Sequence, residues 1–162
     1  MLNERVDNYL DVIESIDNTK EISDPAKRFT SLFGDLKKGA NENTIKQLYA
    51  ADFYFNDTFK TIKNIDELVS YMEETSKAVD VTTVDILDVS KSQTDYYLRW
   101  VMHMQFTAKG KKVDSRSIGV TQIRFNEQGK VILHQDYWDG AEGFYQHLPF
   151  VGYIIRKVRD SL

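Results

Sequence analysis

The fold is decided by the stretch from Tyr96 to Trp138, which reads YYLRWVMHMQFTAKGKKVDSRSIGVTQIRFNEQGKVILHQDYW. Its apolar residues recur at every second position in three successive segments, and this period of two is typical of β-strands. The segments are separated by KGK at 109–111 and NEQG at 126–129, which supply the Gly and Asn residues that tight turns favour. The stretch therefore predicts an antiparallel meander of three long strands, over 94–108, 113–125 and 131–138.

The rest of the chain is dominated by helical patterns. Apolar residues at helical spacing predict helices over about 2–20, 24–39, 43–49 and 64–79, and a short terminal helix over 150–162. Strand character returns only at 53–56 and 81–89. Helices followed by a long sheet predict an α+β fold in which the helices cover one face of a strongly curved antiparallel sheet.

Three parts follow from this layout. Residues 1–22 form an N-terminal amphipathic helix, residues 23–149 form the main domain, and residues 150–162 form a helix packed on that same domain. We expect the apolar side of the terminal helix to dock on the domain, with its basic residues facing solvent; these are Arg156, Lys157 and Arg159. The alternative is that this helix forms a lid over a cavity or makes weak contact with an anionic membrane.

Composition narrows the classes of function. The chain has 162 residues, a formal net charge of −4 and no cysteine. The acidic balance argues against a nucleic-acid-binding protein, and the lack of cysteine excludes a disulfide framework, a thiolate nucleophile and a Cys-ligated metal site. His103, His134 and His147 are dispersed, so we expect neither metal nor cofactor. The charged start and the lack of ~18 consecutive apolar residues favour a cytoplasmic protein without membrane contact.

Alternation assigns faces to two of the long strands. Over 96–106 the even positions, which include Trp100 and Met102, are large and apolar and should face the interior. Ser117 and Gly119 of the next strand should lie beside them, and their small volume would leave a cavity that can take a ligand. The opposite, convex face should be exposed and could pair two copies of the chain; it carries Arg99, Val101, His103, Ile118, Val120 and Leu133.

The last strand leaves two alternatives open. Its two sets of alternate residues are Ile132, His134, Asp136 and Trp138, against Val131, Leu133, Gln135 and Tyr137. Hydrophobicity alone favours the second set as the inner one. If the first set faces inward, His134 and Asp136 lie in an apolar concavity, where such a pair could transfer a proton.

Two segments carry a family resemblance: ADFYFND at 51–57, and IRFNEQGKV at 123–131 followed by DYWD at 136–139. Their order and spacing resemble the nuclear transport factor 2-like superfamily over about residues 24–149. The resemblance is closest to the SnoaL-like branch, which includes ketosteroid isomerases, limonene-epoxide hydrolases and polyketide cyclases. It implies a cystatin-like cone of helices on a curved sheet, and a homodimer through the convex sheet face. Fold does not carry function in this superfamily.

The ketosteroid isomerases use an aspartate base and an oxyanion hole made of a tyrosine and a protonated aspartate. The resemblance places the base at Asp57, but the oxyanion positions correspond to Phe29 and Thr121. Losing a hydrogen-bond donor to an oxyanion costs ~3–4 kcal/mol. A steroid isomerase of that mechanism is therefore not expected.

The limonene-epoxide hydrolases hold a water with a Tyr-any-Asn element and an Asp-Arg-Asp arrangement. Tyr54 and Asn56 match the first element and Asp136 matches one aspartate, whereas Trp100 and Met102 occupy the positions of the arginine and the second aspartate. SnoaL-like cyclases need only one aspartate as acid–base group in an apolar cavity. This simpler requirement could be met by Asp136 or by Asp57.

The sequence thus predicts a binding site for a small, apolar, cyclic molecule with one oxygen function. Asp136 would be the acid–base group and His134 its orienting partner, with Asp57 as a second carboxyl. The other predicted ligand-binding residues are Tyr54 and Asn56, which would hold a water, and Phe29, Trp100, Met102, Thr121 and Trp138. In the alternatives, Asp57 only forms a turn, His134 and Asp136 satisfy each other structurally, and the protein is a non-catalytic homodimeric module.

Overall fold

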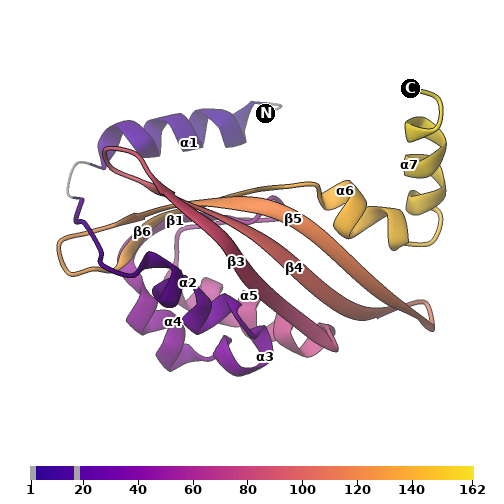
Figure 1. Cartoon of the computed structure of the whole chain (residues 1–162), viewed down its shortest axis with the longest axis horizontal. Coiled ribbons are helices and arrows are strands. Elements are labelled where there is room, and N and C mark those ends of the chain that lie inside the picture. The colour runs from indigo at the N-terminus through magenta and orange to yellow at the C-terminus, as the bar shows by residue number, and fades with distance from the viewer. Residues whose placement is uncertain (1–2, 17–18) are drawn as a thin grey trace.

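One six-stranded sheet forms the centre of the protein, which a computed structural model describes for residues 3–16 and 19–162 (Figure 1). The strand order is β2-β1-β6-β5-β4-β3. β1 runs parallel to β6, and every other neighbouring pair is antiparallel, so the predicted meander is confirmed. The strands are β1 (Tyr49–Asn56), β2 (Thr61–Ile62), β3 (Val81–Lys91), β4 (Tyr96–Ala108), β5 (Lys111–Phe125) and β6 (Val131–Trp138).

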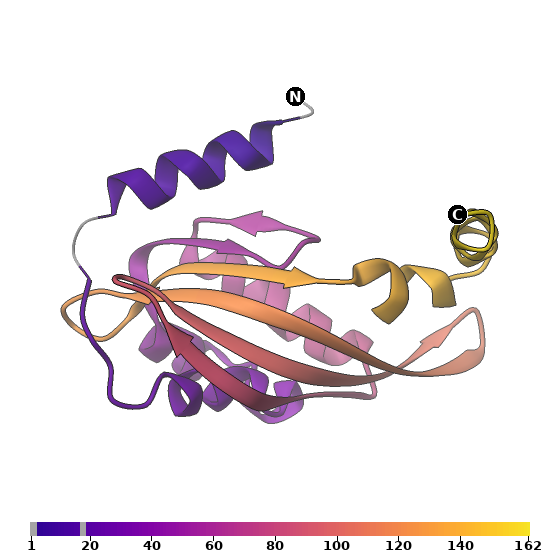
Figure 2. The same ribbon diagram turned by 45° about the horizontal axis from the view of Figure 1, so that its top comes forward.

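Helices lie on both faces of this sheet. The face here called inner is covered by α2 (Pro25–Phe33), α3 (Leu36–Gly39), α4 (Glu42–Leu48) and α5 (Ile65–Ala78), and α1 (Glu4–Ser15) lies across the opposite, outer face (Figures 1 and 2). The chain ends in α6 (Gly140–Gly143), a 3-10 turn η1 (Tyr145–His147) and α7 (Val151–Arg159). No helix in the described part of the chain is both long and apolar enough to cross a membrane. The architecture confirms the predicted α+β fold.

Local sequence explains where the inner helices begin and break. α5 begins after Asn64, whose side-chain oxygen accepts hydrogen bonds from two backbone N–H groups of the first turn, each at 3.0 Å. The predicted single helix over 24–39 is two helices. It breaks at Gly34 and Asp35 because the backbone there reaches the sheet: Val84 N donates to Gly34 O at 3.4 Å, and Asp35 forms a β-bridge with Thr83.

The main core lies between the inner face and α2–α5. The even positions of β4 face it as predicted, with Leu98 and Trp100 both buried. Gly119 lies there too, but the expectation that it leaves a cavity is wrong. A β-carbon at Gly119 would lie 2.4 Å from Cη2 of Trp100. The glycine therefore makes room for the indole ring instead of leaving a space.

The outer face is more covered than predicted. Gln122 and Arg124 point outward, yet both are buried because α1 lies over them. Leu133, predicted at the exposed convex face, pairs with Arg124 and is also fully buried. The predicted helix over 2–20 extends from Glu4 to Ser15, and its positions 2, 17 and 18 lie outside the described residues.

The terminal helix docks with the side opposite to the one predicted. Arg156 donates to Gln146 O, Arg159 pairs with Asp139, and Gly152 packs against the same Gln146 carbonyl. These contacts use the polar side of α7, so Val151, Ile154 and Val158 point to solvent, whereas Ile155 is half-buried. The exposed fractions are 41% for Val151, 48% for Ile154 and 53% for Val158.

Candidate functional site

A cavity of about 130 Å³ lies between the inner face of the sheet and helices α2 and α5. Its wall is mostly apolar and includes four of the predicted ligand-binding residues, namely Phe29, Trp100, Met102 and Trp138. The ionisable groups on this wall are the carboxyl groups of Asp57 and Asp136 and the phenol of Tyr71. The cavity therefore combines an apolar lining with a few convergent polar groups, as small-molecule sites do.

The pairing of β6 with β5 shows which set of alternate β6 side chains faces inward, the question that the sequence left open. Asp136 pairs with Thr121 and His134 pairs with Ile123, and both partners lie on the inner face of β5. His134, Asp136 and Trp138 therefore face inward. Hydrophobicity favoured the set that contains Leu133 as the inner one, and this was misleading because the apolar Leu133 is buried on the outer face.

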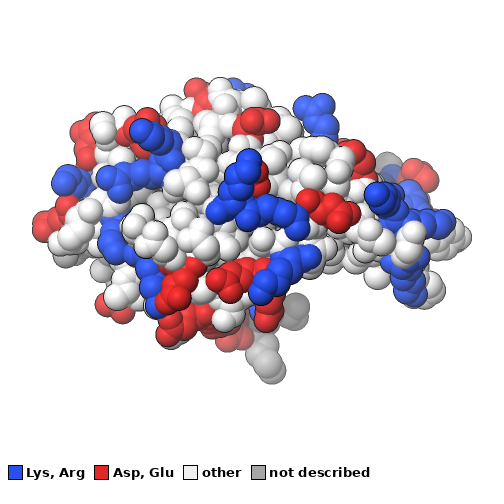
Figure 3. Space-filling view, turned by 90° about the horizontal axis from the view of Figure 1, so that it is seen from below, with Lys and Arg blue, Asp and Glu red and all other residues white. Residues whose placement is uncertain are grey.

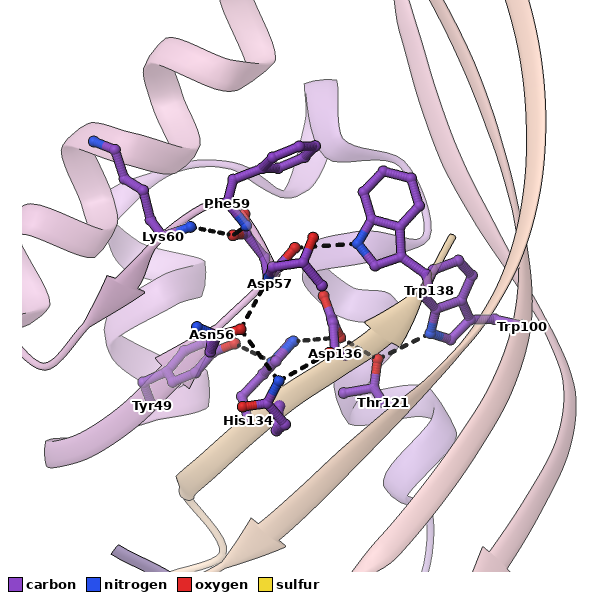
Figure 4. A network of polar contacts seen from close by, with 12 residues as sticks. Tyr49, Asn56, Asp57, Phe59, Lys60, Trp100, Thr121, His134, Asp136 and Trp138 are labelled. Atoms are coloured by element: carbon purple, nitrogen blue, oxygen red, sulfur yellow. Dashed lines mark hydrogen bonds and ion pairs between the residues drawn. The ribbon is translucent and has the colours of Figure 1, made fainter. Parts of the chain in front are cut away.

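The Asp136 carboxylate is held by one of its two oxygens (Figure 4). Oδ1 accepts from Thr121 Oγ1 at 2.6 Å and lies 2.9 Å from His134 Nε2. The indole N–H of Trp100 donates to Thr121 Oγ1 at 2.9 Å, so the hydroxyl proton of Thr121 is left for the carboxylate. Within residues 3–16 and 19–162, no group hydrogen-bonds to Oδ2. One oxygen is thus oriented by the protein, and the other is free to meet a ligand.

Behind Asp136, His134 is fully buried and its Nδ1 lies 2.8 Å from the Tyr49 hydroxyl. Burial raises the pKa of the Tyr49 phenol, and the charge of Asp136 raises that pKa further, so the phenol keeps its proton. The phenol therefore serves as the donor to Nδ1, and this bond assigns the ring proton of His134 to Nε2, where it faces Asp136.

Asp57 combines a turn with a place on the cavity wall. Its Oδ1 accepts from the backbone N–H groups of Phe59 at 3.0 Å and Lys60 at 2.9 Å, so Asp57 does stabilise a turn. Its Oδ2 accepts from the Tyr71 hydroxyl. Burial raises the pKa of the Asp57 carboxyl, and the charge of Asp136 adds to the rise, whereas the bond from Tyr71 opposes it.

The raised pKa of Asp57 leads to a prediction about stability and pH. A raised pKa means that the folded protein binds this proton more tightly than the unfolded chain, so stability falls as pH rises from 3.8 through the folded-state pKa. Asp57→Asn keeps an oxygen for the two backbone donors and removes the buried charge. We expect its melting temperature to exceed that of the wild type at pH 7.5 and the advantage to disappear below pH 4, in thermal unfolding followed by circular dichroism.

Asp52→Asn is the matched control, because Asp52 lies on the same strand and is exposed. It should leave the melting temperature almost unchanged at both pH values. A lower melting temperature of Asp57→Asn than of the wild type at pH 7.5 would contradict the assignment of a buried, costly carboxylate.

Two predicted site residues point away from the cavity, and a third, Thr121, is fully buried behind Asp136 and does not line it. Tyr54 and Asn56 point to the outer face, because alternate residues of a strand face opposite sides and Phe55 faces the core. The Tyr54 hydroxyl donates to Gln135 Oε1 at 3.3 Å, and Asn56 Oδ1 accepts from Gln135 Nε2 at 3.1 Å. Their predicted role of holding a water in the cavity is therefore wrong.

Two residues of the site, Tyr49 and Tyr71, were not predicted from the sequence. Tyr71 could have been found, since it lies three residues after Leu68 and next to Met72 on the apolar side of a predicted helix. No local pattern leads to Tyr49, because its contact joins residues 85 positions apart.

Aromatic residues that follow α6 pack against one end of the cavity wall. The ring of Phe59 lies 5.5 Å from Trp138, 5.4 Å from Phe144 and 5.7 Å from Tyr145, measured between centroids. It is thus the segment before α7 that covers this end. In the described residues, no group of three or more His, Asp or Glu side chains is arranged to hold a metal ion.

Comparisons with solved structures agree with this fold. A protein from Catenulispora acidiphila with a ketosteroid isomerase-like fold, solved with trimethylamine, is 17% identical, covers 76% of this chain and 95% of its own, and has a TM-score of 0.63. A protein from Shewanella putrefaciens, provisionally assigned as a SnoaL-like polyketide cyclase, is 15% identical over 75% of this chain and 94% of its own, with the same TM-score of 0.63. An NTF2-like protein of unknown function from Exiguobacterium sp. 255-15 is 16% identical over 70% and 96%, with a TM-score of 0.56.

These identities establish the fold alone. No curated protein matches the sequence. The family model of the SnoaL-like domain matches residues 33–134, which is more than half of the chain. The predicted membership is confirmed, and this protein belongs to the SnoaL-like domain family.

Proposed function

We propose that the cavity binds a small, apolar, cyclic molecule with one oxygen function and that Asp136 transfers a proton to or from it. The observation that supports this most is the arrangement of the Asp136 carboxylate on an apolar wall. Thr121 and His134 occupy one oxygen, and the other has no hydrogen bond from the described residues. A general base needs an oriented and unoccupied oxygen of this kind.

Size and chemistry limit the ligand. Cavities of about 150 Å³ with apolar walls take up benzene, so a cavity of about 130 Å³ suits a single ring. Two carboxyl groups on an otherwise apolar wall suit a carbonyl or hydroxyl group on that ring. A cyclic ketone meets both conditions.

In this proposal Asp136 acts as the general base and Asp57 as the general acid. Asp136 Oδ2 takes a proton from the carbon next to the ligand carbonyl, and His134 is a positioning residue that orients the carboxylate. Asp57, whose pKa is raised by burial, carries a proton to a higher pH than an ordinary carboxyl and gives it to the carbonyl oxygen. The ligand becomes its enol, and the reverse transfers complete an isomerisation or an exchange.

Cyclohexanone is the probe for this proposal. Saturation-transfer NMR should show binding, and proton NMR in D₂O should show exchange of its α-protons faster than in buffer. Val84→Phe places a larger side chain into the cavity wall and should abolish both signals. Val89→Phe makes the same change at an exposed position of the same strand and should preserve them.

The outcomes separate the two parts of the proposal. Equal binding by the Val84→Phe variant, once circular dichroism shows it folded, would reject the cavity as the ligand site. Binding without exchange above the buffer rate would reject the acid–base role and favour a non-catalytic binding module.

Pairing of two copies through the outer sheet face stays a prediction. Ile118 is 71% exposed there and Val101 and Val120 are partly exposed, which supports a self-association surface beside α1. Native mass spectrometry reports the number of subunits and any retained ligand in one spectrum.

A further inference from the structure

The terminal helix α7 presents an apolar strip to solvent. Val151, Ile154 and Val158 recur at intervals of three and four residues, so they lie on one side of the helix, and the exposed Leu162 follows shortly after its end. The contacts of Arg156 and Arg159 with the body hold the opposite side. The strip is therefore kept facing outward by specific polar contacts, and not by fraying of the chain end.

A cluster of lysines lies at the same end of the molecule. The hairpin between β4 and β5 carries Lys109, Lys111 and Lys112, all exposed, and none pairs with an acidic side chain of the described residues. Leu148, just before α7, packs in one cluster with Ala108 and Val113, which flank this hairpin. Figures 1 and 2 both show the hairpin tip and α7 at the same end.

Positive charge is concentrated at this end. Residues 150–162 contain three basic residues and one acidic residue, and the hairpin adds three lysines, on a protein whose net charge is −4. In Figure 3, Lys and Arg side chains lie at the right-hand end, where α7 lies, as well as at the centre and left of this face. The exposed apolar strip is thus flanked by cationic groups.

We propose that this end of the protein, made of the apolar strip of α7 and the three lysines of the β4–β5 hairpin, binds the surface of an anionic lipid bilayer. A short amphipathic helix with a basic side lies in the interface with its apolar side among the acyl chains. Lysines beside it add attraction to anionic headgroups. The apolar strip and the lysines lie at the same end of the protein. No rearrangement is needed for binding, because α7 already turns the strip outward.

A bilayer fits this end better than a second copy of the chain does. In a symmetric dimer the same patch meets itself, so the two sets of lysines would face each other and repel. Stable protein interfaces also bury on the order of 1,600 Å² with close shape complementarity, and a few side chains on and just after one short helix cannot supply that. A bilayer requires neither a matching shape nor a minimum area.

Vesicle flotation tests the proposal, with phosphatidylcholine vesicles prepared with and without phosphatidylglycerol. The wild type should float with the anionic vesicles and much less with the neutral ones. Ile154→Asp/Val158→Asp should not float with either. Lys109→Glu/Lys111→Glu/Lys112→Glu should lower partitioning to anionic vesicles at least about tenfold, because each cation near the surface is worth several-fold in binding.

Leu87→Asp/Val89→Asp is the matched control, since it places two charges on exposed apolar positions of β3. It should float like the wild type. The proposal is overturned if the wild type does not float, or if the Ile154→Asp/Val158→Asp variant floats equally well. It is also overturned if sedimentation velocity without lipid shows an oligomer that this variant dissociates, because a second copy would then cover the strip.

Discussion

Asp136→Asn should slow the α-proton exchange of cyclohexanone by about a hundredfold to ten-thousandfold, the range that general acid–base groups contribute. The amide retains an oxygen for the bonds from Thr121 and His134, so the fold of the site should survive. What it loses is the ability of the free oxygen to accept a proton. The exchange rate is measured by proton NMR in D₂O, at a pH where an ordinary carboxyl is ionised.

Asp85→Asn is the control for this substitution, because Asp85 is an exposed aspartate on β3. It should exchange cyclohexanone protons at the wild-type rate. An Asp136→Asn variant that binds the probe and exchanges its protons as fast as the wild type would reject Asp136 as the acid–base group and leave the cavity as a binding site.

Arg124→Leu should lower the free energy of unfolding by about 3–5 kcal/mol, since it leaves a buried charge without its partner. Arg124 and Asp95 are both buried, and the guanidinium also donates to the carbonyl groups of Ile13 at 3.3 Å and Ile16 at 2.9 Å. These bonds attach the C-terminal end of α1 to the sheet. Urea unfolding measures the loss, and limited proteolysis should show faster cleavage around residues 13–20.

The double variant Asp95→Leu/Arg124→Leu separates the two consequences. Replacing both charges by apolar groups should restore much of the lost stability, because buried ion pairs exchanged for apolar side chains are often neutral. The cleavage near α1 should remain fast, because its carbonyl groups have still lost their donor. A cost of less than about 1 kcal/mol for Arg124→Leu would mean that the pair behaves like a solvent-exposed one.

The alternation of side chains along a strand predicts the positions of some site residues but not of others. Asp57 was assigned by resemblance, and its position two residues after Phe55 puts it on the inner side. The same alternation places Tyr54 and Asn56 on the other side, so a motif of adjacent residues was split between two faces. Residues that are adjacent in a strand face opposite sides of the sheet, so a short motif does not place all its residues in one site.

The two ends of the chain show a different limit. Amphipathic patterns predicted both terminal helices, but a pattern says only that one side is apolar and not what that side meets. α1 lies over Gln122 and Arg124 through polar contacts, and α7 turns its apolar side to solvent. The predicted lack of membrane contact rested on the charged start and the lack of a long apolar segment, and neither concerns the side that α7 turns to solvent. The cytoplasmic location stays a prediction.

The sequence by itself determined the meander, the helical segments and the inward direction of Trp100 and Met102, because periods of two and 3.6 residues act over a few neighbours. The tertiary structure alone decided the direction of β6, the contacts of Tyr49 with His134 and of Tyr71 with Asp57, and the surfaces that α1 and α7 meet. These depend on groups that are far apart in the chain. Their contacts form only when the whole sheet and its helices pack together, and no local pattern carries that information.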